Sequence, residues 1–327
     1  MNMRRIYNIA LGVLAGITIS FGSWAQPAPY PSRPLRIVVA FEAGTYTDIV
    51  ARMLADRLSV RLGQPVTVEN RPGAGGNIGT EYVALSPADG YIILFVSIAT
   101  HGINPSLFKN LKYDAQKDFT PLSLTMKVPN VAVVHPSVQA RTLKELVDYA
   151  KVNPGKLDYA SAGPGTSQHM TGELLKSLTE THILHIPYKG SQAAVTDLLS
   201  GRVQVSFLNL PFVLPYVKDQ RLRALVITSD KRSTVMPDVP SAGQAGFPGF
   251  TATSWSGMVV RSGTPQPIVD RLGRELRDIT RSPDMMKFFE GGGAEGVGSS
   301  PEEFKNFINE EIVKWRGVVE RSGAKVE

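Results

Sequence analysis

Apolar residues along the chain alternate between short continuous runs and runs with helical spacing. Leu35–Phe41 reads LRIVVAF, a continuous apolar stretch typical of a strand covered on both faces. Thr47–Leu62 carries apolar residues three or four positions apart, which predicts an amphipathic helix. A strand at Val66–Val68, a short helix at Ile78–Leu85 and a strand at Tyr91–Val96 follow. This βαβαβ order predicts a parallel sheet with right-handed connections.

The middle of the chain repeats this alternation, and the last part is mostly helical. The predicted strands of the middle part are Val131–Val134, Leu157–Ala160, Ile183–Ile186, Val203–Phe207 and Ala224–Thr228. The predicted helices that follow are Thr142–Val152, Ser167–Leu178, Ala193–Leu199, Pro267–Ile279 and Pro301–Glu320. Ser300 and Glu303 form a capping box at the start of the last helix.

Two α/β units followed by a helical tail predict two lobes, and 327 residues are enough for two domains of about 100–150 residues each. Pro121–Pro129 and Gly246–Ser256 are the expected crossings between the lobes, because both stretches are extended rather than helical in pattern. We expect residues 26–126 to form the first part of lobe 1, residues 127–251 to form lobe 2, and residues 252–327 to complete lobe 1.

The first 25 residues have the pattern of a secretory signal peptide. Met1–Arg5 carries two arginines, Ile9–Phe21 is an apolar run of 13 residues, and a small-residue site ends at Ala25. A bilayer span needs about 20 apolar residues, so this run is too short for a membrane anchor. We therefore expect export to the periplasm with cleavage after Ala25.

Composition excludes several classes of protein. The chain contains no cysteine, which excludes disulfide scaffolds, thiolate metal sites and cysteine nucleophiles. Lys and Arg number 35 against 29 acids, a net charge of +6, or +4 without the two arginines of the signal peptide. The basic residues are interleaved with acids and form no aromatic–basic stripe, which argues against nucleic acid as a partner.

Polar, glycine-rich segments follow four of the predicted strands. They are Gly44–Asp48, Ser97–His101, Ser161–Ser167 and Tyr188–Ser191. In open parallel sheets, ligands bind at the carboxyl ends of the strands, where helix N-termini present free N–H groups and partial positive charge. The pattern favours a cleft for a carboxylate or phosphate group. Ordinary helix caps and turns are the alternative interpretation of any single segment.

Motifs for catalysis or cofactors are incomplete. Ser106 and Lys109 match Ser-x-x-Lys without its companion motifs, and Gly165–His169 lacks the last glycine of a nucleophile elbow. His182 and His185 have no nearby carboxylate with metal-site spacing, so we predict no metal. The glycines of Asn70–Gly76 fit no nucleotide-binding motif, and we predict no cofactor. A secreted hydrolase or isomerase of carboxylate substrates remains the alternative function.

Several sequence blocks together resemble one family. They are Pro31–Phe41, Glu69–Gly76, Thr100–Pro105, Tyr159–Gly163, His185–Gly190, Leu222–Leu225, Pro237–Ser241 and Ser322–Lys325. With them, the chain from Tyr30 onward resembles the substrate-binding proteins of tripartite tricarboxylate transporters, the Bug-type periplasmic solute-binding proteins.

The resemblance implies a two-lobed α/β periplasmic binding protein, a type II-like Venus flytrap whose lobes are mostly parallel sheets flanked by helices. It implies no enzyme activity, a monomer, and capture of an organic acid by hinge closure. The partner would be a membrane permease of one large and one small subunit, or a sensor kinase. The ligand contacts implied, with Asn209 added, are Thr45, Tyr46, Thr47, Asp48, Ser97, Thr100, His101, Ser161, Thr166, Ser167, His169 and Asn209.

Two departures from the family pattern bear on the ligand. The family usually has consecutive glycines, or Gly-Pro, where this chain has Thr45 and Tyr46, and it commonly has an aspartate where this chain has Leu208. A phenol ring would fill cleft volume or stack on a flat ligand, and a lost carboxylate would disfavour an amino group. We therefore expect a carboxylate less polar than citrate, with an aromatic acid among the candidates.

Overall fold

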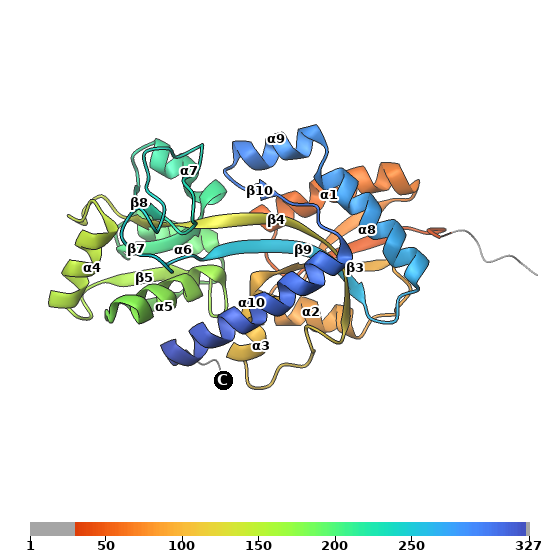
Figure 1. Cartoon of the computed structure of the whole chain (residues 1–327), viewed down its shortest axis with the longest axis horizontal. Helices are drawn as coiled ribbons and strands as arrows, with labels where there is room; N and C mark the ends of the chain where they lie inside the picture. Colours follow the sequence, from red (N-terminus) through yellow and green to blue (C-terminus); the bar gives the residue numbers. More distant parts are fainter. Residues whose placement is uncertain (1–29, 325–327) are drawn as a thin grey trace, which may run out of the picture.

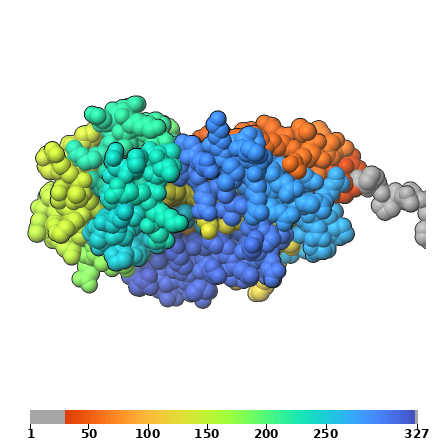
Figure 2. All heavy atoms as spheres, turned by 45° about the horizontal axis from the view of Figure 1, so that its top comes forward, coloured from red at the N-terminus to blue at the C-terminus, as the bar shows by residue number. Residues whose placement is uncertain are grey.

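The computed structural model describes residues 30–324, so the predicted signal peptide and its cleavage site lie outside the described residues. It is an α/β protein whose two lobes are joined by two long strands (Figure 1). These strands are β4 (Phe119–Val134) and β9 (Thr253–Arg261). They pair antiparallel over residues 119–129 of β4, and atoms of β4 are visible in yellow between the lobes in Figure 2.

The first lobe combines the N-terminal and C-terminal parts of the described chain. Its N-terminal elements are β1 (Leu35–Val39), α1 (Tyr46–Leu62), β2 (Val66–Asn70), η1 (Ala74–Gly76), α2 (Asn77–Ala84), β3 (Ile92–Ser97), η2 (Ala99–Ile103) and α3 (Asn104–Leu107). Its C-terminal elements are α8 (Gln266–Thr280), α9 (Pro283–Gly291), β10 (Glu295–Gly296) and α10 (Pro301–Ser322). Helix α8 packs against α1.

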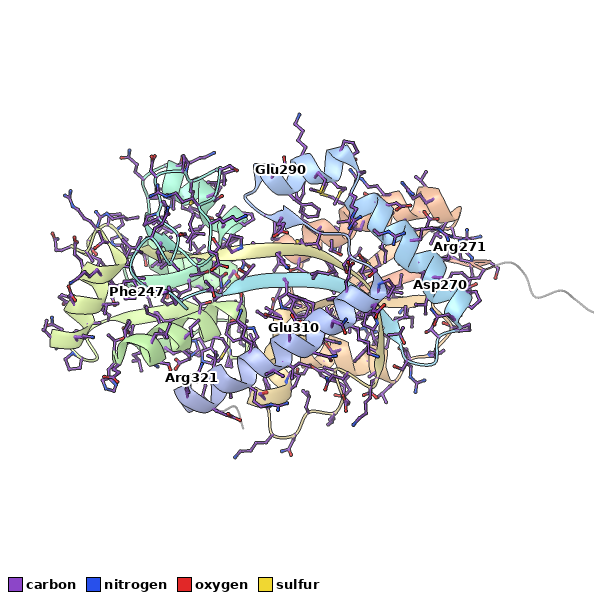
Figure 3. All side chains as sticks on the ribbon, viewed as in Figure 1. Phe247, Asp270, Arg271, Glu290, Glu310 and Arg321 are labelled. Carbon is purple, nitrogen blue, oxygen red and sulfur yellow. The ribbon has the colours of Figure 1, made fainter. Side chains whose placement is uncertain are left out.

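The second lobe is built from the middle of the chain. Its elements are α4 (Leu143–Val152), β5 (Asp158–Ser161), α5 (Ser167–Thr179), β6 (Leu184–Pro187), α6 (Ser191–Leu199), β7 (Val205–Asn209), α7 (Leu210–Lys218) and β8 (Arg223–Ile227), with the end of β4. In Figure 3 Phe247 lies on this lobe, whereas Asp270 and Arg271 lie on α8 in the first lobe.

One continuous mixed sheet runs through both lobes. Its strand order is β2-β1-β3-β9-β4-β7-β5-β6, and β8 and β10 pair with β4 beside this path. The outer neighbours β1–β2, β1–β3, β5–β6 and β5–β7 are parallel, whereas β4 and β9 run antiparallel to their neighbours. The predicted α/β class with two lobes is confirmed. The antiparallel centre arises because each connecting strand enters one lobe from the other.

Burial of apolar faces explains the helix positions. In the first lobe Ile37 of β1 and Leu54 and Leu58 of α1 are fully buried in one cluster. In the second lobe Val133 of β4 packs with Leu198 of α6. Burying such a side chain contributes about 1.5–3 kcal/mol.

Most predicted elements are present with shifted ends, and some elements of the structure were not predicted. Pro121–Pro129, expected to be extended, is extended as part of the 16-residue strand β4. No strand was predicted at β9, although Gly246–Ser256, expected as an extended crossing, overlaps its start, and no helix was predicted at α7 or α9. Helix α7 contains Pro215 within it and therefore resembles a loop in sequence.

Candidate functional site

A cavity of about 310 Å³ lies between the lobes, and residues from all four of the predicted glycine-rich segments line it. The segment after β1 contributes Gly44–Thr47, the segment after β3 contributes Ser97, and the segment after β5 contributes Thr166 and Ser167. The segment after β6 contributes Lys189–Gln192. Helices α1, α5 and α6 therefore begin at this one cavity, and α7 adds its N-cap residue and Phe212.

The first-lobe wall is the turn that opens α1. Its N-cap Thr45 accepts a hydrogen bond from the Asp48 amide at 3.3 Å, and the Asp48 carboxylate accepts one from the Gly44 amide at 2.9 Å. The same carboxylate accepts from Arg52 at 3.0 Å and from Asn70 at 2.8 Å. Burial alone would raise the pKa of Asp48, but the hydrogen bonds, led by that of Arg52, outweigh it and lower the pKa. Asp48 is thus an ionised support for the turn.

The second-lobe wall is the turn that opens α5. Its N-cap Thr166 accepts from the His169 amide at 3.3 Å, and the Gly165 amide donates to His169 Nδ1 at 3.3 Å. The His169 ring stacks on His185 with 4.2 Å between centroids, and His185 Nε2 lies 2.6 Å from Ser161 Oγ. Burial is the main cause that lowers the pKa of His169 to about 4 and that of His185 to about 3. Both rings are therefore neutral at pH 7.

Gln168 connects two of the helix starts. Its Oε1 accepts from the Ala162 amide at 2.8 Å, and its Nε2 donates to Ser191 Oγ, the first residue of α6, at 2.8 Å. The side chain is almost fully buried and lines the cavity. Because both ends of its amide are occupied, Gln168 holds the starts of α5 and α6 in a fixed relation.

Unpaired backbone amides line both walls. The first N–H groups of a helix have no acceptor within the helix. Within residues 30–324, the amides of Tyr46, Thr47, Ser167 and Gln168 make no hydrogen bond, and all four residues line the cavity. Helix starts from opposite lobes therefore present N–H donors and partial positive charge to one space, which suits an anion.

Strands β3 and β9 provide a part of the cavity lining that carries hydroxyl groups. Ser97 at the end of β3 pairs in register with Ser256 of β9, and Ser254 lies two residues away on the same strand face. Ser97 is 6% exposed, and its Oγ has no hydrogen-bond partner among the described residues. A buried hydroxyl without a partner costs about 1–3 kcal/mol, so a polar group of a guest would satisfy it.

Apolar side chains form the rest of the lining. Phe41, Met126, Val128 and Phe212 contribute from both lobes. Tyr46 is also among the lining residues, and its ring stacks on Phe288 of α9 with 5.9 Å between centroids. The other departure from the family pattern, Leu208, is fully buried in the second-lobe core outside the lining. The apolar character of the cavity therefore comes from these lining side chains and not, as the sequence suggested, from Leu208.

Charged side chains are sparse in this lining. Glu42 from the first lobe and Lys189 from the second are the charged residues among those that line the cavity, and both are exposed. No arginine is present in the described lining and Lys189 is exposed, so recognition of an anion would depend mainly on backbone amides and hydroxyls.

The structure separates the predicted ligand contacts into two groups. Those that line the cavity are Thr45, Tyr46, Thr47, Ser97, Thr166, Ser167 and Asn209. Those that lie outside the lining are Asp48, Thr100, His101, Ser161 and His169. Three of the second group hydrogen-bond to the first: the Asp48 and His169 amides donate to the hydroxyls of Thr45 and Thr166, and the Thr100 hydroxyl accepts from the Ser97 amide at 3.2 Å. Contact of either group with a ligand stays a prediction.

His101 is the most deeply placed of this second group. It is fully buried and packs against Phe119 with 4.9 Å between ring centroids. Burial lowers the pKa of His101 to about 3, so this ring is also neutral at pH 7. Its place in the first-lobe core indicates a packing role.

Sequence reasoning missed Gln168, Phe212, Ser254 and Ser256, and part of the signal was present. Ser254 and Ser256 alternate with the buried Trp255, a pattern of period two that predicts a strand with one polar face. Gln168 directly follows a predicted helix start, but a side chain that joins two helices has no sequence signature.

Metal-binding groups and membrane-spanning helices were both sought among the described residues. Among residues 30–324, no group of three or more His, Cys, Asp or Glu side chains is placed to hold a metal ion. No helix in the same part of the chain is long and apolar enough to cross a bilayer.

Comparison with known proteins gives consistent matches. The model of the family described as "Tripartite tricarboxylate transporter family receptor" matches residues 50–324. Protein BugT of Bordetella pertussis is 39% identical over 100% of both chains. The structure of Rpa4515 from R. palustris with adipate has a TM-score of 0.86 at 34% identity and covers 91% of this chain and 100% of its own. MatC of Rhodopseudomonas palustris with bound malate has a TM-score of 0.83 at 31% identity, covering 89% and 100%.

Proposed function

Because the chain belongs to the tripartite tricarboxylate transporter receptor family, we propose that it captures an organic carboxylate in the cavity between its lobes. The observation that carries the proposal is the convergence of unpaired helix N-terminal amides from both lobes on one cavity. A carboxylate placed there would contact both lobes at once. Only the closed form would bring both lobes into contact with the ligand. This difference in contacts is the condition for closure driven by a ligand.

The proposed ligand is a small carboxylate less polar than citrate, with aromatic acids included. Phe41, Met126, Val128 and Phe212 give the cavity an apolar side, and buried arginine is absent from the described lining. Two similar structures hold adipate and malate, which are small dicarboxylates. A ligand with an anionic end for the helix-start amides and an apolar body for the apolar side of the cavity fits better than one with charge along its whole length.

Calorimetry with refolded, ligand-free protein tests the ligand class. The panel is benzoate, 4-hydroxybenzoate, adipate, malate, citrate and aspartate. We expect the aromatic acids or adipate to bind at least about tenfold more tightly than citrate, a difference of about 1.4 kcal/mol. Tighter binding of citrate or aspartate than of every other acid in the panel would contradict the proposed ligand class. Mass spectrometry of small molecules released from the native protein identifies the natural ligand independently.

A receptor and an enzyme differ in the fate of the ligand. We propose a receptor without enzyme activity, in which the bound acid is recovered unchanged and the melting temperature rises with occupancy. Conversion of the acid during incubation would favour the hydrolase or isomerase alternative. The proposed partner is a membrane permease with a large and a small subunit, and co-purification from membranes of the native host tests it.

The proposed location is the periplasm, reached through the signal peptide at residues 1–25. The expected mature protein begins at Gln26 and is a monomer. N-terminal sequencing of the periplasmic fraction and light scattering test the two points. A mature chain that retains Met1 would contradict cleavage after Ala25.

A further inference from the structure

The two cavity-facing helices that open with threonine begin with the same backbone conformation. Thr45 has φ −71° and ψ 158°, and Thr166 has φ −71° and ψ 157°. The glycines before them, Gly44 and Gly165, have φ of 80° and 79°. Each threonine hydroxyl also donates to the carbonyl three residues earlier, at 3.0 Å in the first lobe and 2.7 Å in the second. Helices α1 and α5 therefore reach the cavity through the same turn.

The side chain three positions after each threonine closes the turn. Asp48 Oδ2 accepts the Gly44 amide, and His169 Nδ1 accepts the Gly165 amide. These side chains belong to residues that are 2% and 7% exposed and stay outside the cavity lining. We infer that His169 is a positioning residue that does for α5 what Asp48 does for α1. It fixes the turn so that the first amides of the helix face the ligand.

The charge one helical turn further explains why the two supports differ. In the first lobe that position is Arg52, which binds the Asp48 carboxylate. In the second lobe it is Glu173, a buried acid paired with Lys176 at 2.8 Å. A carboxylate at position 169 would lie one turn from Glu173 and would be repelled by it, whereas a neutral imidazole is not. Each lobe therefore uses the acceptor that its neighbouring charge allows.

This role fixes the protonation state of His169. Nδ1 accepts a hydrogen bond only when the ring is neutral and its proton is on Nε2. Titratable groups near the ring are His185 of β6, Tyr159 of β5, whose hydroxyl oxygen lies 3.2 Å from the His169 carbonyl oxygen, and Glu173 and Lys176 of α5 itself. Burial, followed by the Lys176 charge, keeps the pKa of His169 at about 4. The inference depends on the proposed function only where it invokes the ligand.

The first test needs no ligand. Long-range ¹H–¹⁵N NMR of the wild-type, ligand-free protein at pH 7 distinguishes the two imidazole tautomers. The inference predicts that His169 carries its proton on Nε2 and that its Nδ1 is unprotonated. A His169 ring that carries its proton on Nδ1 overturns it, because such a ring cannot accept the Gly165 amide.

The second test compares His169→Leu with His169→Asn. Leucine removes the acceptor, whereas asparagine supplies a neutral oxygen at a similar place. In hydrogen exchange of the ligand-free proteins, we expect residues 161–166 to exchange about tenfold faster in the leucine variant, as for one lost hydrogen bond, and the asparagine variant to restore most of the protection. Residues 42–45, supported by Asp48, are the internal control and should not change.

Adipate affinity, measured by calorimetry, gives the functional readout. We expect it to fall about tenfold in His169→Leu and to return to within about threefold of wild type in His169→Asn. Wild-type exchange and affinity in the leucine variant, or equal losses in both variants, would overturn the role of His169. If the wild-type protein binds none of the acids in the panel, the proposed function fails, and the tautomer and exchange results still decide the role of His169. If His169→Leu does not fold, the tautomer and the asparagine variant decide it.

Discussion

The turn that opens α1 and the turn that opens α5 are built alike, but they have different surroundings. The first-lobe turn is supported by an ionised network of Asp48, Arg52 and Asn70. The second-lobe turn is supported by His169 and His185, which are neutral and stacked. The shared backbone gives both helix starts the same turn at the cavity, whereas the supporting side chain differs with the local charge.

The two turns also differ in what faces them. An added Cβ at Gly44 would meet nothing within 4 Å, whereas one at Gly165 would lie 2.5 Å from Asn104 Oδ1 of the first lobe. Beside this contact, an added Cβ at Gly75 would lie 3.0 Å from the Pro164 carbonyl. The glycine-rich Asn70–Gly76 motif, which fits no nucleotide site, thus allows the lobes to approach closely. The second-lobe turn is part of the contact between lobes.

The largest expected difference between the two supports is their response to acid. The pKa of His169 is lowered to about 4, and those of His185 and His101 to about 3. A histidine with a lowered folded pKa binds fewer protons when folded, so the free energy of unfolding falls as pH drops from about 6.5 towards the folded pKa. The expected slope is on the order of 1 kcal/mol per pH unit for each neutral buried ring.

Chemical unfolding between pH 7 and 4.5 measures this slope. His169→Asn should reduce it, because the variant lacks one of these buried rings. The lowered pKa of Asp48 acts in the same direction but at lower pH, since its contribution is complete above the ordinary carboxyl pKa of 3.8 and is lost only as pH falls below it. If the free energy of unfolding kept its full pH dependence between pH 7 and 4.5 without His169, the lowered pKa of His169 would be contradicted.

The next effect is the loss of the first-lobe support. Asp48→Ala removes the acceptor for the Gly44 amide, Asn70 and Arg52 and should lower the free energy of unfolding by about 2–3 kcal/mol. Denaturant unfolding measures it. The matched control is Asp148→Ala, which breaks the exposed pair with Lys144 and should cost less than about 0.5 kcal/mol. Similar losses in both variants would show that Asp48 is not a support.

Gly44→Ala and Gly165→Ala form a matched pair. Their φ angles are 80° and 79°, so both variants carry the same backbone penalty of about 1–2 kcal/mol. Only the β-carbon at Gly165 collides with Asn104, so that variant should lose about 1 kcal/mol more and should bind ligand more weakly. Small-angle scattering with ligand should show a more open Gly165→Ala protein. Equal stability and equal shape would contradict an interlobe contact at this turn.

The smallest expected effect is the loss of one tyrosine hydroxyl in each lobe. The Tyr46 hydroxyl is buried without a partner among the described residues, so Tyr46→Phe should be neutral or slightly stabilising. The Tyr159 hydroxyl donates to Glu173 at 2.7 Å, so Tyr159→Phe should cost about 1–2 kcal/mol. Thermal unfolding measures both. A loss at Tyr46 as large as that at Tyr159 would indicate a partner for the Tyr46 hydroxyl.

The sequence predicted the α/β fold and the four glycine-rich segments because both depend on local patterns. Apolar runs such as Leu35–Phe41 and cap residues such as Thr45 and Thr166 carry their meaning within a few positions. The Gly165–Asn104 contact and the link from Gln168 to Ser191 join residues distant in sequence, and no local pattern encodes them. For the same reason the sequence could not separate lining residues such as Ser167 from supports behind them.

The central claim is that helix starts in both lobes bind one carboxylate through their amides. Backbone ¹H–¹⁵N spectra of the ligand-free protein, titrated with the tightest-binding acid of the panel, test it most directly. We predict saturable shifts of the Tyr46 and Thr47 amides in one lobe together with those of Ser167 and Gln168 in the other, with the same midpoint. Shifts confined to one lobe, or binding that leaves all four amides unchanged, would contradict the claim.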